Sequence, residues 1–156
     1  MMELSIPLPD ERATARLGAA LAGRLKAGDV IGLSGPLGVG KTALARAIIA
    51  ALTGRAEAPS PTFTLVETYE TPNFPLFHFD LYRLERADEV WELGFEDALD
   101  GVCLIEWPER IGRLLPENAL ALGLQMDGSA RRAIVRGSPG WAARLSGLNP
   151  AEGRQG

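Results

Sequence analysis

The stretch Gly35-Pro36-Leu37-Gly38-Val39-Gly40-Lys41-Thr42 decides the fold of this chain. It has the form G-x-x-x-x-G-K-[ST], in which glycines let the backbone curl around an anion with its N–H groups pointing inward. In such a loop the lysine reaches the outer phosphates of a nucleotide, and the final hydroxyl can bind magnesium. The stretch therefore predicts a nucleoside triphosphate site, with Lys41 at the phosphates and Thr42 at the metal.

The flanking sequence fits a strand–loop–helix unit. Residues 30–34 form a short apolar run with β-branched residues, which is typical of a buried strand. Residues 41–52 are rich in helix formers and are followed by Gly54, a common helix terminator. A glycine turn without a ligand is the alternative, but this strand–loop–helix context favours the phosphate site.

The rest of the chain predicts an α/β protein. Asp10 is the expected N-cap of the first helix. The expected elements, in chain order, are a strand at 3–7, a helix at 11–26, an antiparallel pair at 63–69 and 74–80, short helices at 87–93 and 96–99, a strand at 102–105, a helix at 108–113, and a hairpin of 119–126 with 131–136. This order predicts a three-layer P-loop nucleotide-binding domain with a mixed, mainly parallel central sheet. We expect one domain over residues 1–146 and a disordered tail over 147–156.

Composition narrows the function classes. The 156 residues are 46% hydrophobic and 23% charged, as in ordinary globular proteins. A net charge of −4 argues against a broad nucleic-acid-binding face, so a role in an RNA pathway would be exercised through protein partners. No apolar run approaches the roughly 20 residues of a membrane span, and the N-terminus lacks secretory-signal features, so we expect a cytoplasmic protein. The single cysteine, Cys103, lies in an apolar run and is expected in the core.

Two carboxylates follow apolar strands. Glu106 comes directly after the run 102–105, and Asp80 ends the run 74–80. Ligands of open α/β sheets bind outside the carboxyl ends of the strands, and a phosphate site needs a carboxylate for magnesium or its water shell. Both residues are therefore candidates for metal binding or catalysis. The alternative is that each carboxylate caps the helical segment that follows it.

Four other side chains are weaker candidates. Ser60 and Thr62 lie in a proline-containing loop after the helix expected at 41–52, where nucleotide switches place a hydroxyl, although both fit ordinary loop positions. His78 is the only histidine, and a packed or hydrogen-bonded imidazole is favoured over a general base. Trp107 either packs beside Glu106 or lies at the site.

Four motifs together resemble one known family: Gly35 to Thr42, Ser60-Pro61-Thr62-Phe63-Thr64-Leu65-Val66, His78-Phe79-Asp80-Leu81-Tyr82-Arg83-Leu84, and Ile105-Glu106-Trp107-Pro108-Glu109. In order and spacing they are similar to the TsaE (YjeE) family, small bacterial ATPases of tRNA threonylcarbamoyladenosine biosynthesis. The resemblance covers about residues 6–116. It implies a cytoplasmic ATPase that joins the TsaB–TsaD pair and supports threonylcarbamoyl transfer to the adenosine beside the anticodon. The protein would not perform the transfer itself and would meet tRNA only indirectly.

The resemblance also implies roles for single residues. Lys41, Asp80, Glu106 and Thr62 would be catalytic: Lys41 would hold the β- and γ-phosphates, Asp80 would act at the metal or the attacking water, and Thr62 would be the switch hydroxyl. Magnesium would be ligated by Thr42 and Glu106. The implied ATP-contacting set is Glu11, Gly35, Pro36, Leu37, Gly38, Val39, Gly40, Lys41, Thr42, Ala43, Trp107 and Arg132, with Glu11 and Arg132 on the nucleoside side.

One position departs from the family pattern. The family loop usually has an aspartate after its first glycine, where this chain has Pro36. A proline keeps its carbonyl but lacks an N–H, so we expect effects on hydrolysis and partner coupling. Two other functions stay open. A nucleotide-dependent switch would bind without useful turnover, and a small-molecule kinase would need a basic lid that residues 87–120 do not show. Arg83 is the nearest candidate for an arginine finger.

Overall fold

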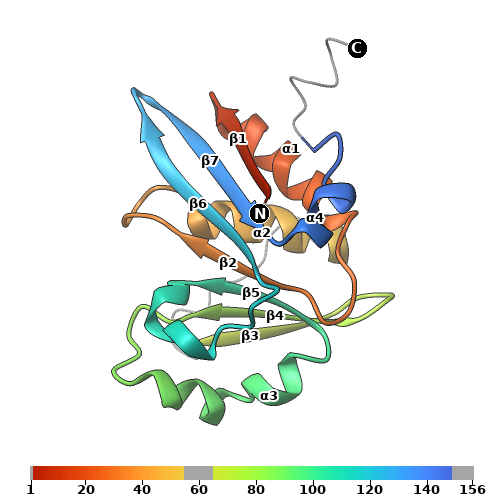
Figure 1. Ribbon diagram of the computed structural model, residues 1–156, viewed down its shortest axis with the longest axis vertical. Helices are drawn as coiled ribbons and strands as arrows, with labels where there is room; N and C mark the ends of the chain where they lie inside the picture. Colours follow the sequence, from red (N-terminus) through yellow and green to blue (C-terminus); the bar gives the residue numbers. More distant parts are fainter. Residues whose placement is uncertain (1, 55–64, 149–156) are drawn as a thin grey trace.

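One mixed sheet organises the computed structural model, which describes residues 2–54 and 65–148 (Figure 1). Its strands are β1 (Met2–Leu8), β2 (Val30–Ser34), β3 (Val66–Glu70), β4 (Pro75–Asp80), β5 (Val102–Glu106), β6 (Leu120–Asp127) and β7 (Ala130–Gly137). Their spatial order in the described part of the chain is β1-β7-β6-β2-β5-β4-β3. The central strands β6, β2, β5 and β4 pair in parallel, whereas β1–β7, β6–β7 and β3–β4 are antiparallel. The predicted α/β class with a mixed sheet is confirmed, with the parallel pairs at its centre.

Helices lie on both faces of the sheet. Helices α1 (Glu11–Ala22) and α2 (Lys41–Thr53) lie side by side on one face, and shorter segments cover the other (Figure 1). These shorter segments are the 3-10 helix η1 (Ala87–Leu93) and helix α3 (Phe95–Ala98). Because successive strand side chains point to opposite faces, β2 contributes Ile31 and Leu33 to one buried cluster and Val30 to the other. No helix within the described ranges is long and apolar enough to cross a membrane.

Several local predictions are confirmed. The side chain of Asp10 accepts a hydrogen bond from the Ala13 N–H at 2.9 Å and caps α1. Helix α2 ends at Thr53, and Gly54 adopts the left-handed conformation that commonly follows a helix. Cys103 is fully buried, and burial raises the pKa of its thiol to about 12. This thiol therefore belongs to the core.

Other segments differ from the prediction. Helix α1 ends at Ala22 rather than Lys26, because the chain turns and the Lys26 N–H bonds the Asp29 carboxylate at 2.8 Å. The segment after Trp107 forms two 3-10 turns, η2 (Pro108–Arg110) and η3 (Gly112–Leu114), instead of one helix.

The C-terminal part contains a helix that the sequence pattern did not predict. Helix α4 (Pro139–Arg144) buries Trp141, whose Nε1–H donates to the carbonyl of Asn118 at 2.8 Å. Leu148, inside the segment expected as a tail, is buried. Residues 149–156 lie outside the described part of the chain.

The sheet brings the candidate site together. The predicted phosphate-binding loop connects β2 to α2. In the strand pairing, Glu106 lies opposite both Leu33 of β2 and Asp80 of β4. The loop and both carboxylates therefore lie together at the carboxyl ends of three neighbouring parallel strands, as the sequence predicts.

Candidate phosphate and metal site

Three glycines of the loop of residues 35–42, Gly35, Gly38 and Gly40, have positive φ. Gly35 has φ 135° and Gly40 has φ 109°, a range that other residues rarely adopt. A Cβ at Gly35 would lie 2.4 Å from the carbonyl oxygen of Leu124, so the neighbouring strand β6 approaches the loop too closely for a side chain. Backbone freedom and close packing thus both require glycine at position 35.

Lys41 folds back over the loop at the start of α2. Its ammonium donates to the carbonyls of Gly35 and Pro36, the latter at 2.9 Å. It also lies 4.0 Å from the centre of the Trp107 ring. Burial lowers the pKa of Lys41, and the negative charges of Glu106, Glu109 and Asp80 oppose that shift. Pro36 lacks an N–H, but its carbonyl is one of the groups that position the lysine.

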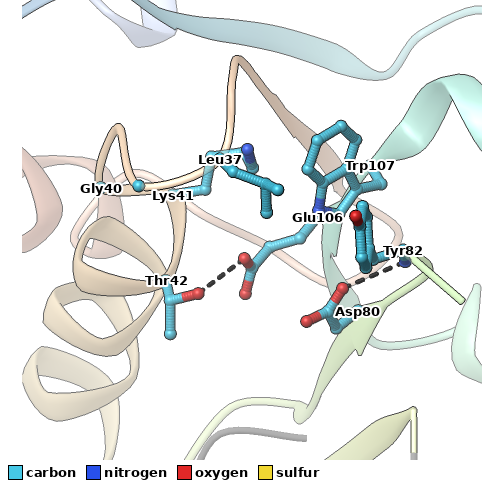
Figure 2. Close-up of a pocket in the computed structure, with 9 residues that line it drawn as sticks. Leu37, Gly40, Lys41, Thr42, Asp80, Tyr82, Glu106 and Trp107 are labelled. Atoms are coloured by element: carbon cyan, nitrogen blue, oxygen red, sulfur yellow. Dashed lines mark hydrogen bonds between the residues drawn. The ribbon is translucent and has the colours of Figure 1, made fainter. Parts of the chain in front are cut away.

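Glu106 is the buried carboxylate of the site, with a side chain only 2% exposed. Its Oε1 accepts a hydrogen bond from the Thr42 hydroxyl at 2.7 Å (Figure 2). Its Oε2 lies 2.7 Å from Nε2 of His78, which is completely buried. Glu106 therefore connects the end of the loop to the interior of β4.

Asp80 lies beside Glu106 on the open side of the site. Its Oδ1 accepts from the Tyr82 N–H at 3.1 Å (Figure 2). Burial raises the pKa of Asp80, and the Glu106 charge adds to this, whereas the Tyr82 N–H, the neighbouring His78 and the Lys41 charge lower it. A carboxylate with a raised pKa is a better proton acceptor than an ordinary one near neutral pH.

Two aromatic rings border this carboxylate. The Tyr82 and Trp107 rings are 5.0 Å apart, and both line the cavity with Asp80. Trp107 has φ 62°, a strained backbone for a bulky residue, and this conformation turns its ring toward Lys41. Strain of this kind is concentrated at functional sites.

Two cavities meet at the loop. The smaller, of about 280 Å³, is lined by Leu37, Gly38, Gly40, Lys41, Thr42, Asp80, Tyr82, Glu106 and Trp107. The larger, of about 720 Å³, lies between the start of α1, the first turns of α2 and the turn before β7; its lining includes Glu11, Gly40, Ala43 and Arg131. Gly40 lines both cavities. The first contains Lys41 and the two carboxylates at the strand ends, and the second has the volume for a larger organic group.

Most of the predicted site residues lie together. Gly35 and Pro36 line neither cavity, but their carbonyls accept from the Lys41 ammonium. Thr62 falls outside the described residues, as does Ser60. Arg132 lines neither cavity and instead bonds Asp127 at 3.0 Å and the Ser5 hydroxyl at 2.9 Å. Val39 lines neither cavity, but its carbonyl accepts from the side chain of Arg131.

Sequence reasoning missed three contributors. Arg131 Nε donates to the Val39 carbonyl at 2.6 Å, and its NH2 group donates to the Gly38 carbonyl at 3.3 Å. Tyr82 lines the smaller cavity. The contact of His78 with Glu106 was also missed. Its signal was that His78 and Asp80 are two residues apart on one strand, so both side chains lie on the same face of the sheet. For Arg131 the sequence carries no such signal.

The donors fit a hard cation such as magnesium. Among the described residues, no group of three or more His, Cys, Asp or Glu side chains could hold a metal by itself. Thr42 and Glu106 offer a hydroxyl and a carboxylate oxygen 2.7 Å apart. Magnesium in phosphate sites is bound by one or two carboxylates together with phosphate oxygens. This sparse oxygen donor set matches that pattern.

Comparisons with known proteins agree with this architecture. A family model described as "Threonylcarbamoyl adenosine biosynthesis protein TsaE" matches residues 8–134. Proteins named tRNA threonylcarbamoyladenosine biosynthesis protein TsaE are similar: one from Rickettsia felis is 45% identical over 76% of this chain and 71% of its own length. One from Bacillus subtilis is 39% identical over 81% and 79%. The crystal structure of Bacillus subtilis YdiB matches with a TM-score of 0.76 and 25% identity over 97% of both chains.

Proposed function

The chain belongs to the TsaE family, and from this premise we propose that it is a cytoplasmic ATPase of tRNA threonylcarbamoyladenosine biosynthesis. In this proposal it binds Mg-ATP at residues 35–42 and hydrolyses it while joined to a TsaB–TsaD complex, which modifies the adenosine beside the anticodon. The names of the relatives support the pathway. The net charge of −4 supports contact with tRNA through protein partners rather than directly.

One observation carries the ATPase proposal. The hydroxyl that ends the phosphate-binding loop lies 2.7 Å from a buried carboxylate that is 64 residues away in the sequence. Burial of an ionised carboxylate is costly unless a cation or hydrogen bonds compensate it. Magnesium held there by Thr42 and Glu106 would neutralise the charge of the phosphate oxygens.

The protein's own groups supply the remaining chemistry in this proposal. Backbone N–H groups of the loop and the start of α2 bind the phosphates. Lys41 lies over the loop, where its ammonium donates to the Pro36 carbonyl, and this ammonium would bind the outer phosphates. Asp80, with its raised pKa, orients the attacking water and accepts its proton. The Trp107 ring shields the lysine from bulk water.

The nucleoside occupies the larger cavity in this proposal. Gly40 lines both cavities, so a chain of phosphates at the loop leads directly from one to the other. Glu11 and Ala43 line the larger cavity, as the proposed nucleoside contacts require. Arg131 takes the position expected for Arg132, because it lines the cavity and also bonds two loop carbonyls.

The protein partner completes the site. Stabilisation of a phosphoryl-transfer transition state commonly uses an arginine that reaches the phosphates. Arg83, the nearest candidate in sequence, does not line the smaller cavity. We therefore infer slow hydrolysis by the isolated protein and faster hydrolysis in the TsaB–TsaD complex.

A nucleotide-dependent switch is the second candidate, and Pro36 favours it. The loop lacks one N–H at this position, which removes a possible donor to the phosphates. Such a protein would bind ATP and ADP and change its affinity for the partner complex without useful turnover. Binding and hydrolysis must therefore be measured separately.

The test is phosphate release from Mg-ATP, with and without TsaB–TsaD, together with nucleotide binding by calorimetry. We expect stimulation by the complex that is lost in Glu106→Gln and kept in Glu96→Gln, a matched change at an exposed glutamate of α3. Binding without hydrolysis in either condition would favour the switch. Absence of nucleotide binding by the wild-type protein would refute both candidates.

A further inference from the structure

His78 is a buried polar residue to which the proposed function assigns no role. It lies in β4 with a side chain 0% exposed, and its Nε2 is 2.7 Å from Glu106 Oε2. A buried imidazole needs a hydrogen-bonding partner to offset its loss of hydration. The contact explains how His78 is tolerated in the core, and it leaves open what the histidine does for Glu106.

The sheet register shows why the two side chains meet. His78 lies opposite Leu104 on the neighbouring parallel strand β5, and Glu106 is two residues further along that strand. Leu104 and Glu106 are two residues apart, so both point to the same face as His78. That face is covered by α2, which begins at Lys41 and presents the Thr42 hydroxyl to Glu106. The arrangement therefore forms a continuous row from Thr42 through Glu106 to His78.

The hydrogen-bonding capacities assign the proton in this row. A neutral imidazole has one N–H donor and one acceptor nitrogen, and an ionised carboxylate only accepts. Within the described ranges, Nδ1 of His78 is buried and has no hydrogen-bond partner. A proton on Nδ1 would leave a buried donor unsatisfied, whereas a proton on Nε2 is used by Glu106. We therefore assign the proton to Nε2.

We propose that His78 is a positioning residue for the metal-binding carboxylate, an inference that rests on the proposed function. By donating from Nε2 to Oε2, His78 fixes the rotation of the Glu106 carboxylate. Oε1 is then held toward the Thr42 hydroxyl, at the edge of the cavity where a cation and the phosphates bind. Partners behind a metal ligand typically contribute 10- to 100-fold to metal affinity.

A purely structural role predicts a different dependence on residue type. If His78 only fills space, variants should affect stability according to volume and burial. If it positions Glu106, the function depends on an N–H donor at the Nε2 position. Glutamine can place its amide nitrogen there, whereas the shorter asparagine places its amide nitrogen near the Nδ1 position. The pair His78→Gln and His78→Asn therefore separates the two roles.

The first experiment measures ADP affinity by calorimetry, with excess Mg²⁺ and with EDTA. We expect His78→Asn to lose about 10-fold or more of the magnesium-dependent gain in affinity, and His78→Gln to keep it within about threefold. Both variants should match the wild type in EDTA, where no metal is involved. An unchanged magnesium effect in a folded His78→Asn variant would overturn the proposal.

The decisive reading of the second experiment comes from the wild-type protein. His78 is the only histidine of the chain, so its imidazole gives a single set of ¹⁵N NMR signals in tag-free protein. We expect the proton on Nε2, with a signal that shifts in Glu106→Gln. A proton on Nδ1 would refute the contact as described. If the wild-type protein binds ADP with the same affinity in Mg²⁺ and in EDTA, the proposed metal site is refuted, and with it the role of His78.

Discussion

Two buried carboxylates at opposite ends of the central parallel strands differ in what compensates their charge. Asp29 immediately precedes β2 and is 4% exposed; Glu106 ends β5 and is 2% exposed. Asp29 contacts the Arg144 guanidinium at 2.5 and 3.1 Å and accepts from the Lys26 N–H at 2.8 Å. Glu106 contacts a hydroxyl and an imidazole. Only Asp29 is thus paired directly with a permanently charged group.

The difference teaches how to separate a structural from a functional carboxylate. The Asp29–Arg144 pair joins α4 to the turn before β2, and the guanidinium supplies the opposite charge within the protein. Glu106 lies at the carboxyl ends of the parallel strands, where ligands bind in open α/β sheets. Its partners are a hydroxyl and an imidazole rather than a guanidinium, as the proposed metal site requires. Four predictions test this distinction.

The largest effect is expected from Glu106→Gln. Glutamine keeps the size of the side chain but removes the charge that would hold magnesium, so hydrolysis in the TsaB–TsaD complex should fall by about 100-fold or more. Thermal unfolding without nucleotide should change little, because the hydrogen bonds are weakly altered. A large loss of stability with normal hydrolysis would place Glu106 in the same class as Asp29.

The reverse result is expected for Asp29→Asn. Removal of one partner leaves the Arg144 guanidinium, only 24% exposed, without its counter-charge, so the free energy of unfolding should fall by about 2 kcal/mol. Urea denaturation measures this loss, and nucleotide affinity should stay within about twofold. The matched control is Glu3→Gln, which breaks an exposed pair with Arg136 and should cost at most about 0.5 kcal/mol. An equal fall in the free energy of unfolding in Asp29→Asn and Glu3→Gln would contradict the claim that burial makes the Asp29 pair more important for stability.

The same distinction applies to two adjacent arginines of β7. Arg132 is paired with Asp127, whereas Arg131 bonds the carbonyls of Gly38 and Val39. Arg131→Gln should weaken ADP binding by about tenfold, because one charged hydrogen-bonding group is worth about 1.5 kcal/mol or more. Arg132→Gln should change it by less than about twofold. Calorimetry on both variants decides between them, and a stronger effect at Arg132 would support the role that the family resemblance implies.

The smallest effect concerns the pH dependence of Asp80. Burial raises the pKa of this carboxyl, so the folded protein favours its protonated form. That contribution is present at low pH and is lost as pH rises through the raised pKa, where the ionised group destabilises the fold. Asp80→Asn should therefore match the wild type near pH 3.5 and melt about 2 °C higher near pH 7, measured in EDTA. A melting difference that is constant with pH would contradict this cause.

Local patterns predicted most of the secondary structure. The glycine-rich loop at 35–42, the Asp10 cap and the hairpin of 119–126 with 131–136 each depend on residues close together in the chain. The loop and the cap are seen where expected, and the hairpin turns at residues 128–129. Strand alternation and apolar runs likewise placed Asp80 and Glu106 at strand ends. The helix at 139–144 was missed because its stability comes from burial of Trp141 rather than from a long periodic pattern.

The sequence by itself determined the glycine-rich loop at residues 35–42 and the strand ends that carry the carboxylates, because both are set by residues close together in the chain. The tertiary structure decided the partners. The Glu106 contacts with Thr42 and His78, the loop contacts of Arg131 and the pairing of Asp29 with Arg144 each join residues 28 to 115 positions apart. Such pairs depend on strand order and register, which bring distant segments together and which no local pattern specifies.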